Sequence, residues 1–554
     1  TVSVLYWRTP LTTMAELPSP PSTAGAVLRV GLLGSEKKFR TFFNGFQAHC
    51  VAAAASSSST APRLECVPLS VDDIEAPDER APGAAPYPAS WASLDVILHK
   101  LSDDIAAARP FDLAKLVSAT GASAFDASAA ITDAPARGTS PKIEATPDTH
   151  ASAEFPPAPE DAAAALFHTE AERRLARLTI DAVVAWERDA PGSRLVFEPP
   201  TAVALTTRRC ATHAALHRAL TAAPPLATEL SIALPWTEVA VTPADEHDLL
   251  TAMRTARCDV LVKSDVACGK SAAHHMCLVT GASPAATPLP TPDDGTRGPN
   301  ERSAPADAPP RAGMRRVLAD DGFAPVAPPP FPRVVQRAVS DADVVFKVYV
   351  LGGIVTLRII RNGIPWIPET RSSPVVAERP AVGASARVPD LTRRWFSSQA
   401  SEFFPVLMES RQLPPSLCAA GAAGVPLAEL PAEAVADVEA FLAAPGGDAI
   451  PGGAKRATVL HAVAVTAARL RTAMGMRMFG FDLAVGSDQS VDPRLQAPCM
   501  APPALEPSSE AGRGVGVVHV LDVNYFPGYK GIRDVNAVVA RLVADTYAAA
   551  CPSR

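Results

Sequence analysis

Short apolar runs, each about the length of one strand, are distributed along this 554-residue chain between long stretches rich in Ala, Pro, Ser and Thr. The 56 prolines are about twice the usual share for a chain of this length. Such stretches bury too little apolar surface to fold by themselves, so the core must be assembled from the runs between them. With 47% hydrophobic residues, the chain holds enough apolar material for a large core.

The order of these runs predicts a mixed α/β fold. AVLRVGLLG (26–34) precedes the helix-like SEKKFRTFFNGFQAHC, and the strand-like SLDVILHKL (93–101) follows. Strand, helix and strand in this order are typical of an α/β layer. Further along, VVFKVYVLGGIVTLRIIRNG (344–363) predicts a hairpin that turns at Gly352-Gly353. Helices are expected within 427–475 and near 533–550.

Composition excludes several classes of protein. The 51 basic and 58 acidic residues give a net charge of −7, which argues against a general nucleic-acid binder. Nine scattered cysteines without a CxxC pair predict reduced thiols and no structural zinc. No apolar stretch reaches the 18 residues of a membrane span. We therefore expect a soluble, cytoplasmic protein.

One motif resembles a nucleotide-binding loop but lacks its context. Ser264–Ser271 reads SDVACGKS, with Ser264 where a Walker A loop has its first glycine. A P-loop needs a long helix after it, so that the helix N-terminus faces the phosphates. Here only a few residues separate the motif from the strand-like MCLVTG, and we do not predict a P-loop.

Oxygen ligands are concentrated near the C-terminus. Asp522 and Asn524 stand two residues apart in VVHVLDVNYF and share one face of the expected strand. Asp482 lies in another apolar strand, FGFDLAV, which can pair with the first through a hairpin. Two carboxylates and an amide oxygen are hard ligands suited to Mg²⁺. A capping Asp and a turn Asn are the simpler interpretation, but FPGYKG with Lys530 follows at once and favours a metal site.

Lysines in apolar surroundings indicate an anion. Lys263 in VLVKSDV and Lys347 in VVFKVYV either extend to solvent or meet a negative group, and together they favour a nucleotide site. Lys38 follows the first strand and Lys100 ends the second. Both lysines therefore stand at the carboxyl ends of neighbouring strands, where open α/β sheets bind their ligands. A solvated face would also explain SEKK.

Several segments, in order, resemble the inositol 1,3,4-trisphosphate 5/6-kinase (inositol-tetrakisphosphate 1-kinase) family of the ATP-grasp superfamily. They cover well under half of the chain but spread across nearly all of its ordered parts. FGFDL followed by DVNYFPGYKG is the most specific of them, together with DVILHKLSD. The other matching segments are VGLLGSEKK, EPPTAV through Arg209, VLVKSDVACGKSAAHHM and VVQRAVSDADVVFKVYVLG.

The resemblance implies an ATP-grasp fold in three domains. An N-terminal α/β domain that binds inositol phosphate would span 26–205, a central ATP-grasp domain 206–347, and a C-terminal ATP-grasp domain with the magnesium site 348–550. Insertions are expected near 52–62, 119–165, 282–332, 372–455 and 487–514.

The resemblance also implies an ATP-dependent kinase for a hydroxyl of an inositol tris- or tetrakisphosphate. We expect the protein to be a monomer and not to bind nucleic acid. Lys263 and His274 would be catalytic, and the loop from Ala267 to His274 would close over the phosphates. The implied ATP contacts are Arg209, Lys263, Gln336 and Lys347, with Gln336 through Lys347 as the hinge strand.

The remaining implied residues bind acceptor and metal. Two Mg²⁺ ions would be held by Asp482, Asp522 and Asn524. The implied acceptor contacts are Lys38, Lys100, His274, Lys347, Asn524 and Gly528, to which the residues themselves add Lys530.

Two other functions stay open. An ATP-grasp carboxylate–amine ligase would share the nucleotide site and would not need Lys38 and Lys100 for a polyanion. A non-catalytic inositol-phosphate-binding protein would not need the metal ligands. The chain also departs from the family, with Cys268 where several members carry His or Asp, and RNGIP in place of Arg-Ser-Leu.

Overall fold

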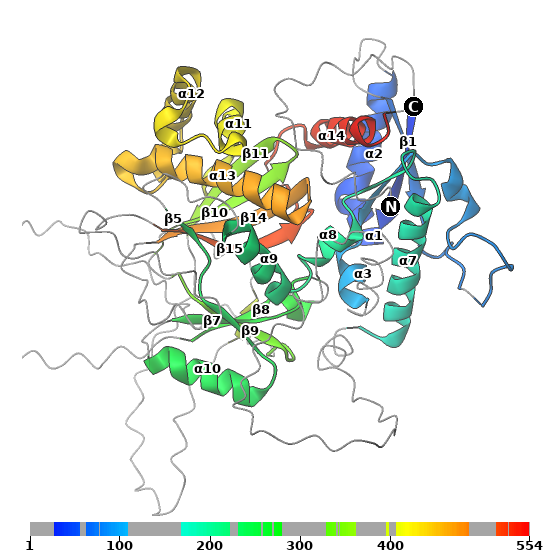
Figure 1. Ribbon diagram of the computed structural model, residues 1–554, viewed down its shortest axis with the longest axis horizontal. Coiled ribbons are helices and arrows are strands. Elements are labelled where there is room, and N and C mark those ends of the chain that lie inside the picture. Colours follow the sequence, from blue (N-terminus) through cyan, green and yellow to red (C-terminus); the bar gives the residue numbers. More distant parts are fainter. Residues whose placement is uncertain are drawn as a thin grey trace, which may run out of the picture.

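The structure is a computed structural model with three sheets (Figure 1). It describes residues 27–55, 63–76, 78–108, 168–221, 231–255, 259–268, 271–279, 328–339, 342, 344–361, 395–397, 406–486, 517–529 and 531–552.

The N-terminal sheet is parallel throughout, in the order β2-β1-β3-β4. The two central strands, β1 and β3, are apolar and largely buried, as is usual for parallel sheets, and the edge strand β2 is mostly exposed or half-buried. All four strands end at the same edge, so the segments after β1, β3 and β4 lie close together there. The strands are β1 (Val27–Gly34), β2 (Arg63–Leu69), β3 (Val96–Lys100) and β4 (Leu195–Phe197).

Helices cover this sheet and connect it to the rest of the molecule. After β1 the chain is helical through α1 (Glu36–Lys38), a π-helical turn (Phe39–Phe43) and α2 (Asn44–Ala55). A capping box between Thr169 and Glu172 starts α7 (Glu170–Arg188), because each side chain satisfies a backbone N–H of the other. The other helices here are α3 (Ser102–Ala107) and α8 (Pro200–Ala204).

A five-stranded sheet of antiparallel neighbours follows, in the order β12-β8-β7-β9-β6. Helix α10 (Pro243–Thr255) packs on β6 and β9, with a small apolar core beneath it. The strands are β6 (Thr237–Ala240), β7 (Val260–Ser264), β8 (His275–Val279), β9 (Arg333–Arg337) and β12 (Trp395–Ser397).

The third sheet has six strands in the order β13-β11-β10-β14-β15-β5, all antiparallel except the last pair. Both predicted hairpins lie in it, β10 with β11 and β14 with β15. Its strands are β5 (Ser231–Ala233), β10 (Val344–Leu351), β11 (Ile354–Arg361), β13 (Val406–Gln412), β14 (Met478–Gly486) and β15 (Val517–Tyr525).

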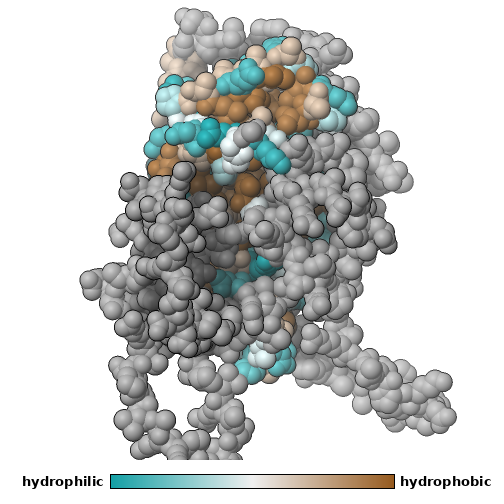
Figure 2. Space-filling view, turned by 90° about the vertical axis from the view of Figure 1, so that its left-hand side faces the viewer, coloured by the Kyte–Doolittle hydropathy of each residue, from teal (hydrophilic) through white to brown (hydrophobic). Residues whose placement is uncertain are grey.

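Helix α13 (Arg456–Met474) lies over the six-stranded sheet, and α9 (Arg209–Thr221) lies between this sheet and the five-stranded one (Figure 1). Helix α14 (Val535–Ala550) packs against both β10 and α2, so the N-terminal and six-stranded sheets share one core. Helices α11 (Pro415–Ala423) and α12 (Ala432–Ala443) stack on α13. Figure 2 shows apolar residues gathered on the face of the molecule at this end.

The three sheets confirm the predicted mixed α/β fold class, with a parallel N-terminal layer followed by two mostly antiparallel sheets. The ATP-grasp arrangement that the resemblance implies stays a prediction. The domain limits stay predictions; the limit proposed at Lys347 falls inside β10. Part of the stretch expected as an insertion near 372–455 is folded, because β13 pairs with β11 and α11 packs on α13. The expected insertions at 119–165 and 487–514 lie outside the described residues.

No helix in the described part of the chain is both long and apolar enough to cross a membrane.

Candidate functional site

Two predicted acceptor lysines converge at the carboxyl edge of the N-terminal sheet. Lys100 ends β3, and its Nζ donates a 2.6 Å hydrogen bond to the backbone carbonyl of Phe526. The same Nζ lies 4.5 Å from the centre of the Phe526 ring. Lys38 ends α1, with its Nζ 3.9 Å from Asp103 Oδ2. Burial, with Lys38 nearby, lowers the pKa of Lys100 to about 7. Lys100 therefore lies beside the segment that follows β15, and Lys38 is close enough to affect its charge.

The predicted metal ligands meet on β14 and β15. Asp482 and Asp522 are directly opposite each other in the register, next to a bulge, and Asn524 is exposed two residues further on. Lys347 on β10 is opposite Asp482, and its Nζ lies 2.9 and 3.2 Å from the two carboxylate oxygens. Asp482 raises the pKa of Lys347. The ammonium group thus offsets one of two facing carboxylates.

The donor set suits Mg²⁺ by its chemistry. Across the described ranges, no three His, Cys, Asp or Glu side chains gather closely enough to hold a metal. The third ligand of the predicted set is an amide, Asn524, and carboxylate and amide oxygens are what Mg²⁺ prefers. Facing carboxylates repel each other unless a cation lies between them. Asp482, Asp522 and Asn524 therefore fit the ion, and their role stays a prediction.

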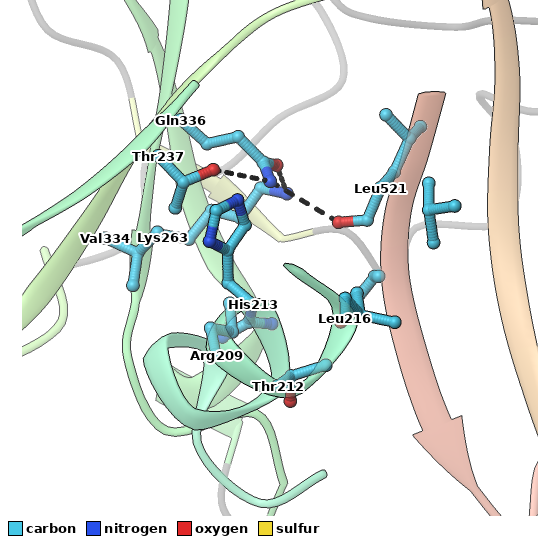
Figure 3. Close-up of a pocket in the computed structure, with 11 residues that line it drawn as sticks. Arg209, Thr212, His213, Leu216, Thr237, Lys263, Val334, Gln336 and Leu521 are labelled. Atoms are coloured by element: carbon cyan, nitrogen blue, oxygen red, sulfur yellow. Dashed lines mark hydrogen bonds between the residues drawn. The ribbon is translucent and has the colours of Figure 1, made fainter. Parts of the chain in front are cut away.

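A pocket lies between the five-stranded and the six-stranded sheet (Figure 3). Its cavity of about 20 Å³ has room for about one water molecule. This volume is too small for a nucleotide. Residues of α9, β6, β7, β9 and β15 line it: Arg209, Thr212, His213, Leu216, Thr237, Lys263, Val334, Gln336, Val520, Leu521 and Asp522.

A chain of hydrogen bonds closes this pocket. Lys263 Nζ donates to Gln336 Oε1 at 2.7 Å. Gln336 Nε2 in turn donates to Thr237 Oγ1 at 3.3 Å and, across the gap, to the carbonyl of Leu521 at 3.4 Å (Figure 3). Burial lowers the pKa of Lys263 to about 8, while Asp522 acts in the opposite direction. Lys263 and Gln336, two of the four residues predicted to contact ATP, are therefore neighbours in one pocket.

Arg209 lines the same pocket, and its guanidinium binds the backbone. Nη1 donates to the carbonyls of Ser264, Val266 and Ala273, at 2.5, 2.8 and 3.3 Å. These contacts fix both ends of the segment that leads to His274. Burial, and then the charge of Arg209, lower the pKa of His274, which favours a neutral imidazole.

Several residues of the site are not among those predicted from the sequence. Thr212, His213 and Leu216 follow Arg209 by three, four and seven positions, so helical periodicity was an available signal. Burial lowers the pKa of His213 to about 4, and its Nε2 donates to the carbonyl of Pro235 at 3.3 Å. Leu521 had no such signal, because its place depends on how two sheets face each other.

Arg358 was also missed. It is opposite Lys347 in the β10–β11 register, and its buried Nε has no hydrogen-bond partner within the described structure. Arg358, Lys347, Asp482 and Asp522 therefore form one row across four strands. Of the other predicted residues, Gly528 is exposed after β15, and Lys530 lies outside the described residues.

The sequence matches no protein-family model and no curated protein. Among solved structures, the ATP-grasp ligase PsnB complexed with a phosphomimetic variant of minimal precursor, Mg and ADP aligns at 12% identity and a TM-score of 0.35, over 93% of this chain and 98% of that chain. The macrocyclase MdnC from Microcystis aeruginosa MRC, bound with precursor peptide MdnA, aligns at 7% and 0.35, over 94% and 100%. Similarity at this level carries no information about the reaction or the substrate of this chain.

Proposed function

We propose that this protein is an ATP-grasp kinase that transfers the γ-phosphoryl group of Mg-ATP to a hydroxyl of an inositol tris- or tetrakisphosphate. One observation carries the proposal. Lys100, from the N-terminal sheet, contacts the segment directly after the strand that bears Asp522 and Asn524. A cation from the N-terminal sheet thereby lies close to the proposed metal ligands, where an anionic acceptor would meet the donor.

The surroundings of Lys100 favour an acceptor with several negative charges. Burial and the neighbouring Lys38 and Lys37 disfavour its ammonium form, and Asp103 opposes them only in part. Bringing like charges together costs free energy unless an anion binds between them. A polyphosphorylated ring would supply several such anions, which would explain why three lysines lie near one another in a chain of net charge −7.

The donor side has the parts that phosphoryl transfer needs. Lys263 lies between the two sheets, where it would offset charge on the ATP phosphates. Asp482, Asp522 and Asn524 would hold magnesium, which would neutralise charge on the terminal phosphates when bound. Lys347, paired with Asp482, connects this group to the acceptor side.

The reaction itself asks mainly for positioning. The ring oxygen bonds to the γ-phosphorus, the bond from that phosphorus to the bridging oxygen of ADP breaks, and the hydroxyl proton leaves to solvent. No side chain has to act as a general base, because charge neutralisation and in-line alignment supply most of the catalysis. His274, held neutral, would donate a hydrogen bond to the transferring group.

An ATP-grasp ligase would use the same donor side, so the acceptor distinguishes the two functions. The test is ADP release from Mg-ATP with a panel of inositol tris- and tetrakisphosphates, with product isomers resolved by chromatography. We expect a new isomer that requires Mg²⁺. Inositol phosphate binding without turnover would favour a non-catalytic binding protein, and ADP release only with a carboxylate and an amine would favour a ligase.

Two sets of variants separate donor from acceptor. Asp522→Ala should abolish turnover and leave the folding transition nearly intact, since the side chain is only half-buried and lines the pocket between the two sheets. Lys38→Ala and Lys100→Ala should raise the KM for the inositol phosphate at least tenfold, with the KM for ATP changed less than twofold. A loss of ATP affinity instead would show that the acceptor pocket lies elsewhere.

A further inference from the structure

A buried glutamate connects the N-terminal sheet to the six-stranded sheet. Glu198 directly follows β4 and is 0% exposed. Its φ of +65° lies in the left-handed region, which costs free energy for a residue with a long side chain. Such backbone persists only where surrounding contacts hold it in place.

Those contacts are present on both sides of Glu198. Oε1 accepts hydrogen bonds from the backbone N–H groups of Arg477 and Met478, each at 2.5 Å, where β14 begins. Its own carbonyl accepts from Nε2 of His99, on β3, at 2.6 Å. Burial lowers the pKa of His99 to about 4, so the imidazole stays neutral and donates from Nε2. One residue therefore joins β3, β4 and β14.

Two more hydrogen bonds cross the same junction. The hydroxyl of Tyr525, the last residue of β15, donates to the carbonyl of His99 at 2.6 Å. Lys100 Nζ donates to the carbonyl of Phe526. The end of β3 is thus bound to the start of β14 and the end of β15, which carry the facing carboxylates Asp482 and Asp522.

We propose that Glu198 is a positioning residue that holds the end of β3 against the start of β14, and so fixes Lys100 relative to Asp482 and Asp522. The role of Lys100 in this inference rests on the proposed function, while the junction itself does not. Glu198 has no place in the transfer step; it acts through the strands that it joins.

The chain offers a matched control in Glu187. It too is a buried glutamate whose pKa burial raises to about 7, as it does for Glu198, and Oε1 accepts the backbone N–H of Val196 at 2.8 Å. Glu187, on α7, connects only elements of the N-terminal domain. Loss of either carboxyl leaves a buried backbone donor unsatisfied, but only Glu198 spans the two domains.

The experiment compares Glu198→Ala, Glu198→Gln and Glu187→Ala in the full chain. Amide hydrogen exchange over 96–101 and 477–482 reports the junction whether or not the protein has the proposed activity. We expect at least tenfold faster exchange in both segments for Glu198→Ala, and near wild-type exchange for the other two. Glutamine keeps the accepting oxygen, and Oε2 of Glu198 has no partner in the described structure that an amide would lose.

Steady-state kinetics then test the consequence for the site. Glu198→Ala should raise the KM for the inositol phosphate at least tenfold, with the KM for ATP within twofold and with Glu198→Gln restoring the wild-type value. If Glu198→Ala does not fold, Tyr525→Phe removes a second hydrogen bond of the junction and should change exchange and KM in the same direction. Equal exchange in the two alanine variants, or unchanged exchange in Tyr525→Phe, would overturn the inference. If the wild-type protein shows no turnover with any inositol phosphate, the proposed function is refuted. The hydrogen-exchange comparison does not depend on turnover and would still decide whether Glu198 holds the junction.

Discussion

At the scale of single residues, the lowered pKa of Lys100 has a measurable consequence. Its value of about 7 lies below the 10.5 of an unfolded lysine, so the unfolded chain holds the extra proton between these values. The contribution of Lys100 to the free energy of unfolding is therefore lowest below pH 7 and rises as the pH increases towards 10.5. A polyanionic acceptor binds the protonated form, so its affinity should fall about tenfold per pH unit above pH 7.5.

Calorimetry in buffers of different ionisation enthalpy measures the linked proton directly. Near pH 8.5, binding of the inositol phosphate should take up about one proton, because bound phosphate restores the ammonium form of Lys100. Lys100→Arg keeps the charge at every pH and should remove both the proton uptake and the pH dependence. A pH dependence that survives in Lys100→Arg would assign it to another group.

The two facing carboxylates predict a substitution that makes the protein more stable and inactive at the same time. Asp522 lies opposite Asp482, and Lys347 pairs with Asp482. Without metal, Asp522→Asn removes a like-charge contact and should raise the free energy of unfolding by about 0.2–1 kcal/mol, while it abolishes turnover. Asp482→Asn is the control, because it also deprives Lys347 of its partner and should give no gain. Urea denaturation in the presence of a chelator measures both, and a less stable Asp522→Asn would contradict the repulsion.

At the scale of elements, the turn between β10 and β11 depends on one glycine more than on the other. Gly352 has a φ of +61°, and a Cβ there would come within 2.7 Å of Leu542 Cδ1 on α14. Gly352→Ala should therefore lower the free energy of unfolding by about 1–2 kcal/mol. A Cβ at Gly353 would meet no atom within 4 Å, and Gly353→Ala should change the free energy of unfolding by less than about 0.5 kcal/mol. Equal losses in urea denaturation would refute this account of the turn.

Local sequence patterns were enough to predict the hairpin strands of the six-stranded sheet. They were not enough to predict the contacts between elements far apart in the chain. Strand periodicity and a Gly-Gly turn predict β10 and β11, and the spacing of Asp522 and Asn524 places both on one face of β15. The bond from Gln336 to Leu521 joins residues 185 positions apart, and the bond from Glu198 to Arg477 joins residues 279 apart. Glu198 follows an ordinary apolar strand, and no local pattern distinguishes it from a loop residue.

At the scale of the whole molecule, the sheet register fixes how long the connection from β8 to β9 must be. Both strands flank β7; Val279 ends opposite Val260, and Arg333 begins opposite Ser264. Four residue steps along β7 are about 13 Å, and two strand spacings across it are about 10 Å. The two ends therefore lie about 16 Å apart. A flexible ten-residue linker has a typical end-to-end distance of about 17 Å, so it is long enough.

The stretch predicted as an insertion at 282–332 is much longer than this connection requires, which leads to a test of whether it serves the site. Replacing 282–327 by a ten-residue Gly/Ser linker should leave kcat/KM for both substrates within about twofold. Stability should rise by up to about 1 kcal/mol, because a shorter loop costs less closure entropy. A second variant with the same linker length but a proline-rich composition controls for stiffness. A folded variant with wild-type ATP affinity and a raised KM for the inositol phosphate would instead show that this segment contributes to the acceptor side, since Lys38, Lys100 and the metal edge are all unchanged in it.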